Sequence, residues 1–264
     1  MWFCASCNLL GDPYMHMKPE ERKTNSSNLV RSSFDYDRTH PRNIQHLQKA
    51  IALDPNNDRA HKELAETHRV NDNYIGWKES IDKAVELAPS KWKSDRAYHL
   101  LFTYRQFDDA LVDLYGIDLL ISEEIQIPMH TSIAIMKGLA YLEKQQYKKA
   151  QEYFIEYIES INVNETLQIE ARYYLGLCLE KQSKWDEALI HFIEAAQKSD
   201  EPAFYVKAAK IYLLTENIPE ARKYLLQAES LFCADPTRQY TPTQQLYTIE
   251  EGDIFMLKSI IDNL

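Results

Sequence analysis

The residues nearest the start of the chain that could carry chemistry are two cysteines, in the segment Cys4-Ala-Ser-Cys7. A Cys-x-x-Cys pair supplies half of a structural zinc site, which needs four ligands. No second pair follows, and His16 completes the set poorly. A redox dithiol normally stands at a helix start in an α/β domain, which this sequence does not predict. Cys178 and Cys233 lie far apart on predicted helices and form no disulfide framework with the pair.

A third interpretation of the cysteine pair is lipid attachment. In bacterial lipoproteins an apolar stretch ends in small residues before the acylated cysteine, and the chain resembles this pattern with Ala5-Ser6 before Cys7. Only six residues precede Cys7 and none of them is basic, so this interpretation requires a start upstream of Met1. An unmodified, unstructured N-terminus and a metal, redox or other acylation role remain the alternatives. The expected location is cytoplasmic as the chain is written, or lipid-anchored in a bacterial envelope if the start lies upstream.

Other catalytic or metal-binding patterns find little support. The eight histidines are scattered, and His61 and His68 stand seven residues apart on one predicted helix. Seven residues are two helical turns, which is too far for one tetrahedral metal. The six glycines form no phosphate-binding loop, and neither a nucleophile elbow nor a His-Glu-x-x-His motif occurs. We therefore expect no catalytic residues, no metal and no cofactor.

Composition points to a folded helical protein. The chain has 264 residues, is 45% hydrophobic and 27% charged, and holds only six glycines and ten prolines. Few turn formers suit helices joined by short turns better than a many-stranded barrel. The net charge of −10 disfavours nucleic acid as a partner, since a phosphate-binding protein needs clustered Lys and Arg. No run of 18 or more apolar residues occurs that would span a membrane.

The elements that position any functional residue follow from an internal repeat. Ala50 and Ala84 are 34 residues apart, and so are Pro55 and Pro89. Near the C-terminal half, Gly176, Ala188, Phe192 and Ala195 show a spacing that Ala209, Ala221, Leu225 and Ala228 repeat 33 residues later. A period near 34 with small residues at fixed offsets predicts stacked helical hairpins.

These residues resemble the tetratricopeptide repeat (TPR) family, whose unit has small residues at positions 8 and 20 and a large apolar residue at position 24. The resemblance covers about residues 42–232. Position 8 is occupied in successive units by Ala65, Tyr98, Gly138, Gly176 and Ala209. Position 20 is occupied by Trp77, Ala110, Ala150, Ala188 and Ala221. Position 24 is occupied by Ile81, Leu114, Phe154, Phe192 and Leu225. The resemblance implies an all-α, right-handed superhelical solenoid of antiparallel helix hairpins.

Three segments follow from this pattern. Residues 1–41 lack a sustained helical period, so we expect an irregular leader, which could lie in the groove of the solenoid. Residues 42–232 should form about five hairpins and a half-repeat. In residues 233–264 we expect a linker and a last helix from about 243 to 262, with Thr241 or Thr243 as its N-cap. This helix should cover the apolar end of the array, or alternatively bind a partner or a second copy.

The resemblance also implies a concave face that binds protein or peptide, lined by positions 2, 5, 9 and 12 of each first helix. The candidates for surface contact on this face are basic in the first unit and largely aromatic in the middle ones: Arg59, Lys62, Arg69, Trp92, His99, Phe102, Tyr173 and Lys210. The Lys-x-x-x-Asn clamp of chaperone-tail-binding members is absent, because Glu66 stands four residues after Lys62. The lining suits an extended or helical peptide with apolar anchors and an acidic end.

The sequence thus predicts a non-catalytic interaction module or scaffold for a protein or peptide partner. Two rival hypotheses remain: a TPR-type envelope lipoprotein that acts in assembly of an envelope complex, and a regulatory subunit of an enzyme. An upstream start with basic and apolar residues would favour the first rival. A convergent polar cluster, which the spacing does not show, would favour the second.

Overall fold

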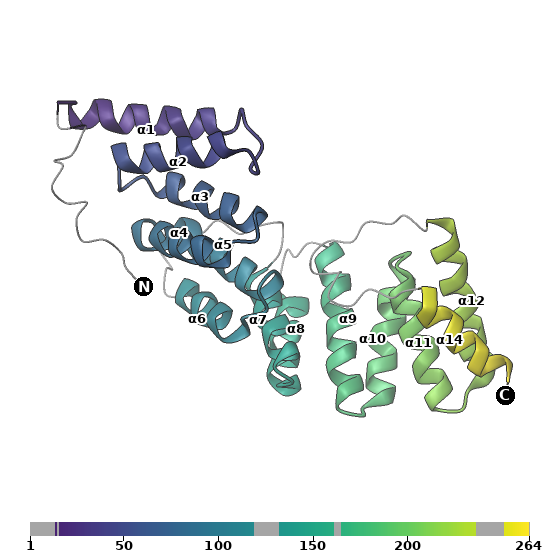
Figure 1. Cartoon of the computed structure of the whole chain (residues 1–264). Coiled ribbons are helices and arrows are strands. Elements are labelled where there is room, and N and C mark those ends of the chain that lie inside the picture. Colours follow the sequence, from purple (N-terminus) through teal and green to yellow (C-terminus); the bar gives the residue numbers. More distant parts are fainter. Residues whose placement is uncertain (1–13, 15, 119–131, 161–164, 236–250, 264) are drawn as a thin grey trace. The chain divides into compact units, whose positions relative to one another are not determined.

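The computed structural model describes residues 14, 16–118, 132–160, 165–235 and 251–263 (Figure 1). The described residues form thirteen α-helices and no strand, which confirms the predicted all-α class. The chain divides into two compact units, Met1–Arg96 with Gly116–Gln126, and Ala97–Tyr115 with Ile127–Leu264. We refer to them as unit 1 and unit 2.

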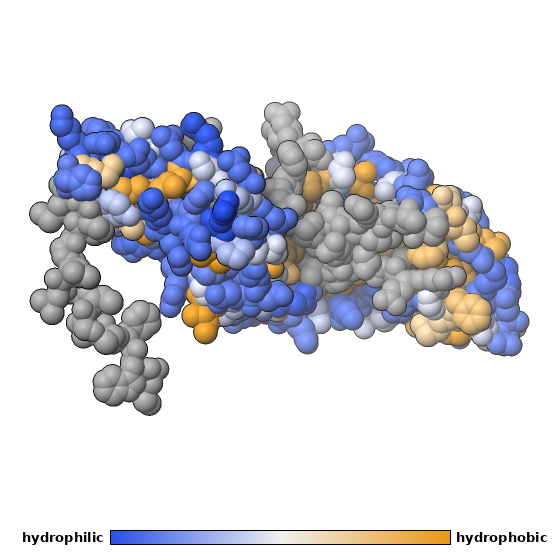
Figure 2. Space-filling view, turned by 45° about the horizontal axis from the view of Figure 1, so that its top comes forward, coloured by the Kyte–Doolittle hydropathy of each residue, from blue (hydrophilic) through white to orange (hydrophobic). Residues whose placement is uncertain are grey.

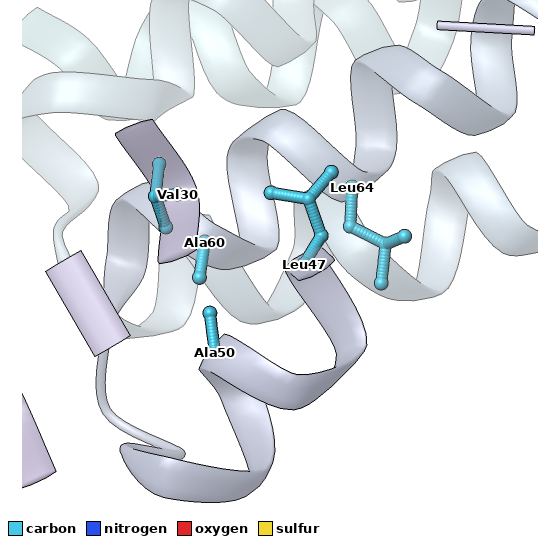
Figure 3. Close-up of a cluster of buried hydrophobic side chains, with 5 residues drawn as sticks. All are labelled: Val30, Leu47, Ala50, Ala60 and Leu64. Atoms are coloured by element: carbon cyan, nitrogen blue, oxygen red, sulfur yellow. The ribbon is translucent and has the colours of Figure 1, made fainter. Parts of the chain in front are cut away.

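Unit 1 consists of α1 (Pro19–Ser33), α2 (Pro41–Leu53), α3 (Asp58–Val70), α4 (Tyr74–Leu87) and the start of α5 (Pro89–Phe102). Within it α1 packs on α2 and α3 packs on α4, so the helices follow one another as hairpins. A buried cluster of Val30, Leu47, Ala50, Ala60 and Leu64 joins α1, α2 and α3 (Figure 3). Small alanines in this cluster let the helices approach closely.

The prediction of an irregular leader through residue 41 is wrong for Pro19–Ser33, which form α1 and pair with α2. The inward residues of α1 are Ser26, Val30 and Ser33, so an apolar stripe is missing. Hydrogen bonds replace it: the Ser26 hydroxyl donates to the Ala50 carbonyl at 2.8 Å and accepts from Asn57 Nδ2 at 2.8 Å. The repeat region, expected from residue 42, is therefore preceded by a helix that forms a hairpin with α2.

Unit 2 contains most of α6 (Phe107–Asp118), then α7 (Ile133–Glu143), α8 (Tyr147–Glu159), α9 (Glu165–Lys181), α10 (Trp185–Gln197), α11 (Pro202–Leu214), α12 (Ile218–Ala234) and α14 (Glu251–Asp262). The helices pair as α7 with α8, α9 with α10, and α11 with α12. Gly138 faces the ring of Phe154, and Gly176 faces the ring of Phe192. These contacts show why a hairpin needs a small residue at one position and a large one at the other.

The turns between paired helices share one backbone conformation. In each of five turns one residue other than glycine has φ between 54° and 60°: Asp72, Arg105, Gln145, Ser183 and Glu216. This left-handed conformation reverses the chain within a few residues. An asparagine then caps the second helix in two of these hairpins, because the side chains of Asn73 and Asn217 accept from the backbone N–H of Gly76 and Glu220.

The last described helix, α14, packs on α12 and α11. Ile254, Leu257 and Ile261 are its buried residues, and Lys258 pairs with Glu229 of α12 at 2.6 Å. The predicted caps Thr241 and Thr243 lie outside the described residues. Leu226 of α12 and Phe255, Met256 and Ile260 of α14 are exposed apolar side chains. Figure 2 shows orange atoms on the surface at this end of unit 2. No described helix is long and apolar enough to cross a bilayer.

Candidate partner-binding surface

Four charged residues of α3 share one side of the helix because they are spaced by three or four residues: Arg59, Lys62, Glu66 and Arg69. We call this set, together with Trp92 of α5, the α3 face. It extends about 15 Å along the helix from Arg59 to Arg69. Arg59 is exposed, whereas Lys62, Arg69 and Trp92 are half-buried. The α3 face contains half of the eight residues that the sequence predicts for partner contact, all within unit 1.

Carboxylates partly neutralise two cations of the α3 face. Arg69 Nη2 lies 2.8 Å from Glu66 Oε2, one helical turn away. Lys62 Nζ lies 3.9 Å from Glu63, whose carboxylate Arg38 also binds at 2.7 Å. Arg38 additionally donates to the Glu63 carbonyl at 3.2 Å. These ion pairs hold the side chains of the face in place and leave Arg59 as its most available charge.

Trp92 adds an aromatic surface beside Lys62. Its indole Nε1 donates to Asp58 Oδ2 at 2.7 Å, which fixes the orientation of the ring. Lys91 Nζ lies 3.3 Å from the same carboxylate oxygen. The Lys62 ammonium is 5.8 Å from the centroid of the Trp92 ring, a cation–π distance. A ring held in place next to a cation can bind an apolar side chain whose neighbour in the ligand is negatively charged.

A cavity of about 180 Å³ lies between the C-terminal part of α1 and the start of α3. It is lined by Ser27, Val30, Arg31, Phe34, Asn57 and Arg59. The Arg59 guanidinium carbon lies 5.7 Å from the centroid of the Phe34 ring, and Phe34 is 47% exposed. The sequence analysis missed Arg31 and Phe34 as site residues because it treated this segment as an irregular leader. The proline at Pro19, followed by Glu20 and Glu21, was an available signal for a helix start.

Charge is unevenly distributed along the chain. Residues 1–96 hold 15 basic and 14 acidic side chains, whereas residues 97–264 hold 15 basic and 26 acidic ones. Residues 1–96 thus have a net charge of +1, and the part of the sequence that follows has −11. An acidic ligand is repelled least by the segment that carries the α3 face.

Two of the other predicted contact residues stand on the part of α5 that belongs to unit 2. His99 is only 8% exposed, with Nδ1 at 3.2 Å from the Thr103 hydroxyl, so it is buried and not a surface residue. Phe102 is half-buried, and its ring packs on Tyr98 at a centroid distance of 4.7 Å.

Tyr173 also lies inside unit 2 and not on a surface. It is 4% exposed, and its ring packs on those of Phe192 and Phe204 at 5.7 and 4.8 Å. Burial, with the nearby carboxylates of Glu180 and Glu201, raises the pKa of Tyr173 far above its usual value. The prediction of Tyr173 as a contact residue is wrong, because the neighbouring α11 covers it with Phe204.

Lys210 of α11 is exposed, as a contact residue requires, but it takes part in a buried ion-pair cluster. Glu180 lies 2.9 Å from Lys207 Nζ and 3.4 Å from Lys210 Nζ. Burial alone would raise the pKa of Glu180, but Lys207 and Lys210 lower it below its usual value. The carboxylate therefore stays charged and ties α9 to α11.

The cysteines divide between buried and exposed positions. Cys7, the predicted lipid attachment site, lies outside the described residues, as does Cys4. Cys178 is buried in α9, and burial raises its thiol pKa to about 12. Cys233 is exposed at the end of α12.

Residues 135–203 match the tetratricopeptide repeat family. No curated protein matches the chain significantly. Among solved structures, the type IV pilus biogenesis factor PilW is 16% identical, with a TM-score of 0.59 over 84% of this chain and 98% of that one. PilF of Pseudomonas aeruginosa is 19% identical, with a TM-score of 0.57 over 85% and 97%. A tetratricopeptide repeat protein from Parabacteroides merdae is 16% identical, with a TM-score of 0.63 over 90% and 86%. At these identities the likeness is one of fold.

Proposed function

We propose that this chain, whose residues 135–203 match the tetratricopeptide repeat family, is a non-catalytic scaffold whose α3 face binds an extended acidic segment of a partner protein. Repeats of this kind present helix faces that hold a partner, which supports the general role. The choice of an acidic segment is specific to this chain. It depends on the chemistry of α3 and on the charge of the sequence around it.

The observation that carries the proposal is the combination of three cations and an oriented indole on one side of α3. Arg59, Lys62 and Arg69 outnumber the single carboxylate of Glu66 in the α3 face. Trp92 supplies an apolar contact whose ring position Asp58 fixes through a hydrogen bond. Charged pairs steer a partner and set specificity, while a fixed aromatic ring contributes contact area at little entropic cost.

The dimensions of the α3 face set the length of the segment that fits. A helix rises 1.5 Å per residue, so Arg59 and Arg69 are separated by about 15 Å along the axis. An extended peptide spans about 3.3 Å per residue, so about five residues cover that distance. We expect acidic side chains near Arg59 and Lys62 and an apolar side chain on Trp92.

The proposal is tested with fluorescent peptides of about eight residues in which Asp and Glu alternate with Phe or Leu, measured by anisotropy on the full chain. We expect the affinity to fall as the sodium chloride concentration rises from 50 to 500 mM, because salt screens the attraction between the acidic peptide and the cations of the α3 face. Lys62→Gln and Trp92→Phe should each weaken binding by about tenfold, equivalent to about 1.4 kcal/mol.

Lys49→Gln is the matched control, since Lys49 is exposed on α2 and has no ion pair within the described residues. It should bind the peptide as the unaltered chain does. Equal binding of a Lys-containing peptide of the same pattern, or an equal loss in the Lys49 variant, would refute the proposal. Circular dichroism should show the same helix content in all variants.

A further inference from the structure

We infer that the cavity between α1 and α3 is a phosphate-binding pocket, which accepts one phosphorylated side chain of the partner segment. The inference rests on the proposed function, because the pocket lies at the Arg59 end of the α3 face. It adds a specific chemical group to the general preference for acidic segments.

The size of the cavity limits the ligand to one side chain. Pockets for drug-sized molecules measure about 300–1,000 Å³, and a cavity of about 150 Å³ holds a benzene ring. With about 180 Å³, the pocket accepts one phosphorylated side chain, such as a phosphoryl group on a single ring. Such a pocket suits a single residue of a longer segment that continues along α3.

The pocket contains two arginines, Arg31 and Arg59. Within the described residues, neither Arg31 nor Arg59 has a carboxylate within 4 Å, whereas Arg38 and Arg69 nearby are both paired. Guanidinium groups bind phosphate with two parallel hydrogen bonds, and arginine is the preferred residue for this purpose. Both arginines are exposed and not held in an ion pair, so they can turn toward a ligand.

The remaining walls of the pocket suit a phosphate attached to carbon. The ring of Phe34 and the side chain of Val30 form an apolar side, and the Ser27 hydroxyl makes no hydrogen bond within the described part of the chain. Asn57 is occupied, because its Oδ1 accepts from the Ala60 N–H and its Nδ2 donates to Ser26. It caps α3, and the N-terminal end of that helix favours an anion. The Asp58 carboxylate there is bound by Trp92 and Lys91.

The charge of the pocket favours phosphate over carboxylate. A phosphorylated side chain carries about −1.5 to −2 at pH 7. The two guanidinium groups of Arg31 and Arg59 match this charge, whereas a carboxylate would neutralise only one of them. The linking carbon atoms of the phosphorylated residue would contact Phe34.

The test is a titration of the isotope-labelled full chain with phenyl phosphate, followed by amide chemical shifts. We expect saturable shifts confined to residues 27–34 and 57–59. Phenyl phosphate should bind at least tenfold more tightly than phenylacetate, which carries one charge, and than inorganic phosphate, which lacks the ring. Arg31→Gln and Arg59→Gln should each weaken binding by about tenfold, equivalent to about 1.4 kcal/mol. Lys49→Gln should leave it unchanged.

Absence of saturation would overturn the inference, and so would equal binding of phenylacetate or full binding by both arginine variants. Equal binding of inorganic phosphate would show an adventitious ion only and would also overturn it. Lys62→Gln separates the two proposals, since it should weaken the acidic peptide and leave phenyl phosphate unaffected. Binding of the acidic peptide without binding of phenyl phosphate would leave the proposed function standing and reject the pocket.

Discussion

Two glycines occupy positions where the ring of a paired helix leaves no room for a methyl group. A Cβ atom on Gly138 would lie 2.5 Å from Phe154 Cε1, and one on Gly176 would lie 2.6 Å from Phe192 Cε1. Both rings are fully buried, so they cannot swing into solvent. We expect Gly176→Ala to lower the free energy of unfolding by about 1–3 kcal/mol, measured by urea denaturation.

Gly252 provides the matched control for that substitution. A Cβ atom there would meet no atom of the described residues within 4 Å, and Gly252 lies in the first turn of α14. Gly252→Ala should therefore leave stability unchanged or raise it by up to about 1 kcal/mol, because alanine favours the helix. Equal effects of the two substitutions would mean that ring contact does not determine the identity of residue 176.

The turns are the elements in which the chain stores backbone strain. Ser183 is exposed and has φ of 59°, a conformation that costs an L residue about 1–2 kcal/mol and glycine almost nothing. We expect Ser183→Gly to raise the free energy of unfolding by about 0.5–1 kcal/mol, after the entropic cost of glycine is subtracted. Thermal denaturation followed by circular dichroism measures the change. Lys149→Gly within α8 should instead destabilise the protein by about 1 kcal/mol, and stabilisation by both would contradict the explanation.

At the scale of elements, the hairpins from α3 onward were predictable because their inner faces combine alanine or glycine with one large apolar residue. Ala65, Ala150 and Ala188 are all completely buried, as the repeat requires. α1 could not be predicted in this way, because Ser26 donates a hydrogen bond to the Ala50 carbonyl of α2 and the Ser33 carbonyl accepts one from Asn43 Nδ2 of α2. Periodicity of hydrophobic residues carries no information about such a contact.

The candidate site likewise contains residues that the sequence predicts and contacts that it does not predict. Arg59, Lys62 and Arg69 were predictable as one set, because residues three and four apart share a helix face. The burial of Tyr173 was not, since it depends on Phe204 of another helix. The cavity beside Phe34 could not be predicted either, because its prediction requires α1 to be recognised as a helix that packs against α2 and α3.

Across the whole molecule, three partly buried histidines should make stability depend on pH. Burial lowers the pKa of His61, His68 and His191, so the unfolded chain binds protons at a higher pH than the folded one. The free energy of unfolding should therefore fall as pH drops below about 6.5, the ordinary histidine pKa. We expect the midpoint of thermal unfolding to decrease between pH 7.5 and 5.5.

Replacing all three histidines with glutamine should flatten that dependence. Glu180 does not add to the pH dependence in this range. Because its pKa is lowered, its contribution to the free energy of unfolding is lost only below about pH 4.5. A triple variant that loses as much stability as the unaltered chain over the same interval would show that other groups are responsible.

The alkylation rate of the buried Cys178 thiol reports how often the helices of unit 2 separate. With a pKa near 12 and no exposure, this thiol is inert toward alkylating reagents while α9 is packed. It becomes reactive only in molecules whose helices have separated, so its alkylation rate measures the frequency of this local opening. Cys233, exposed on α12, reacts without such an event and sets the reference rate within the same molecule.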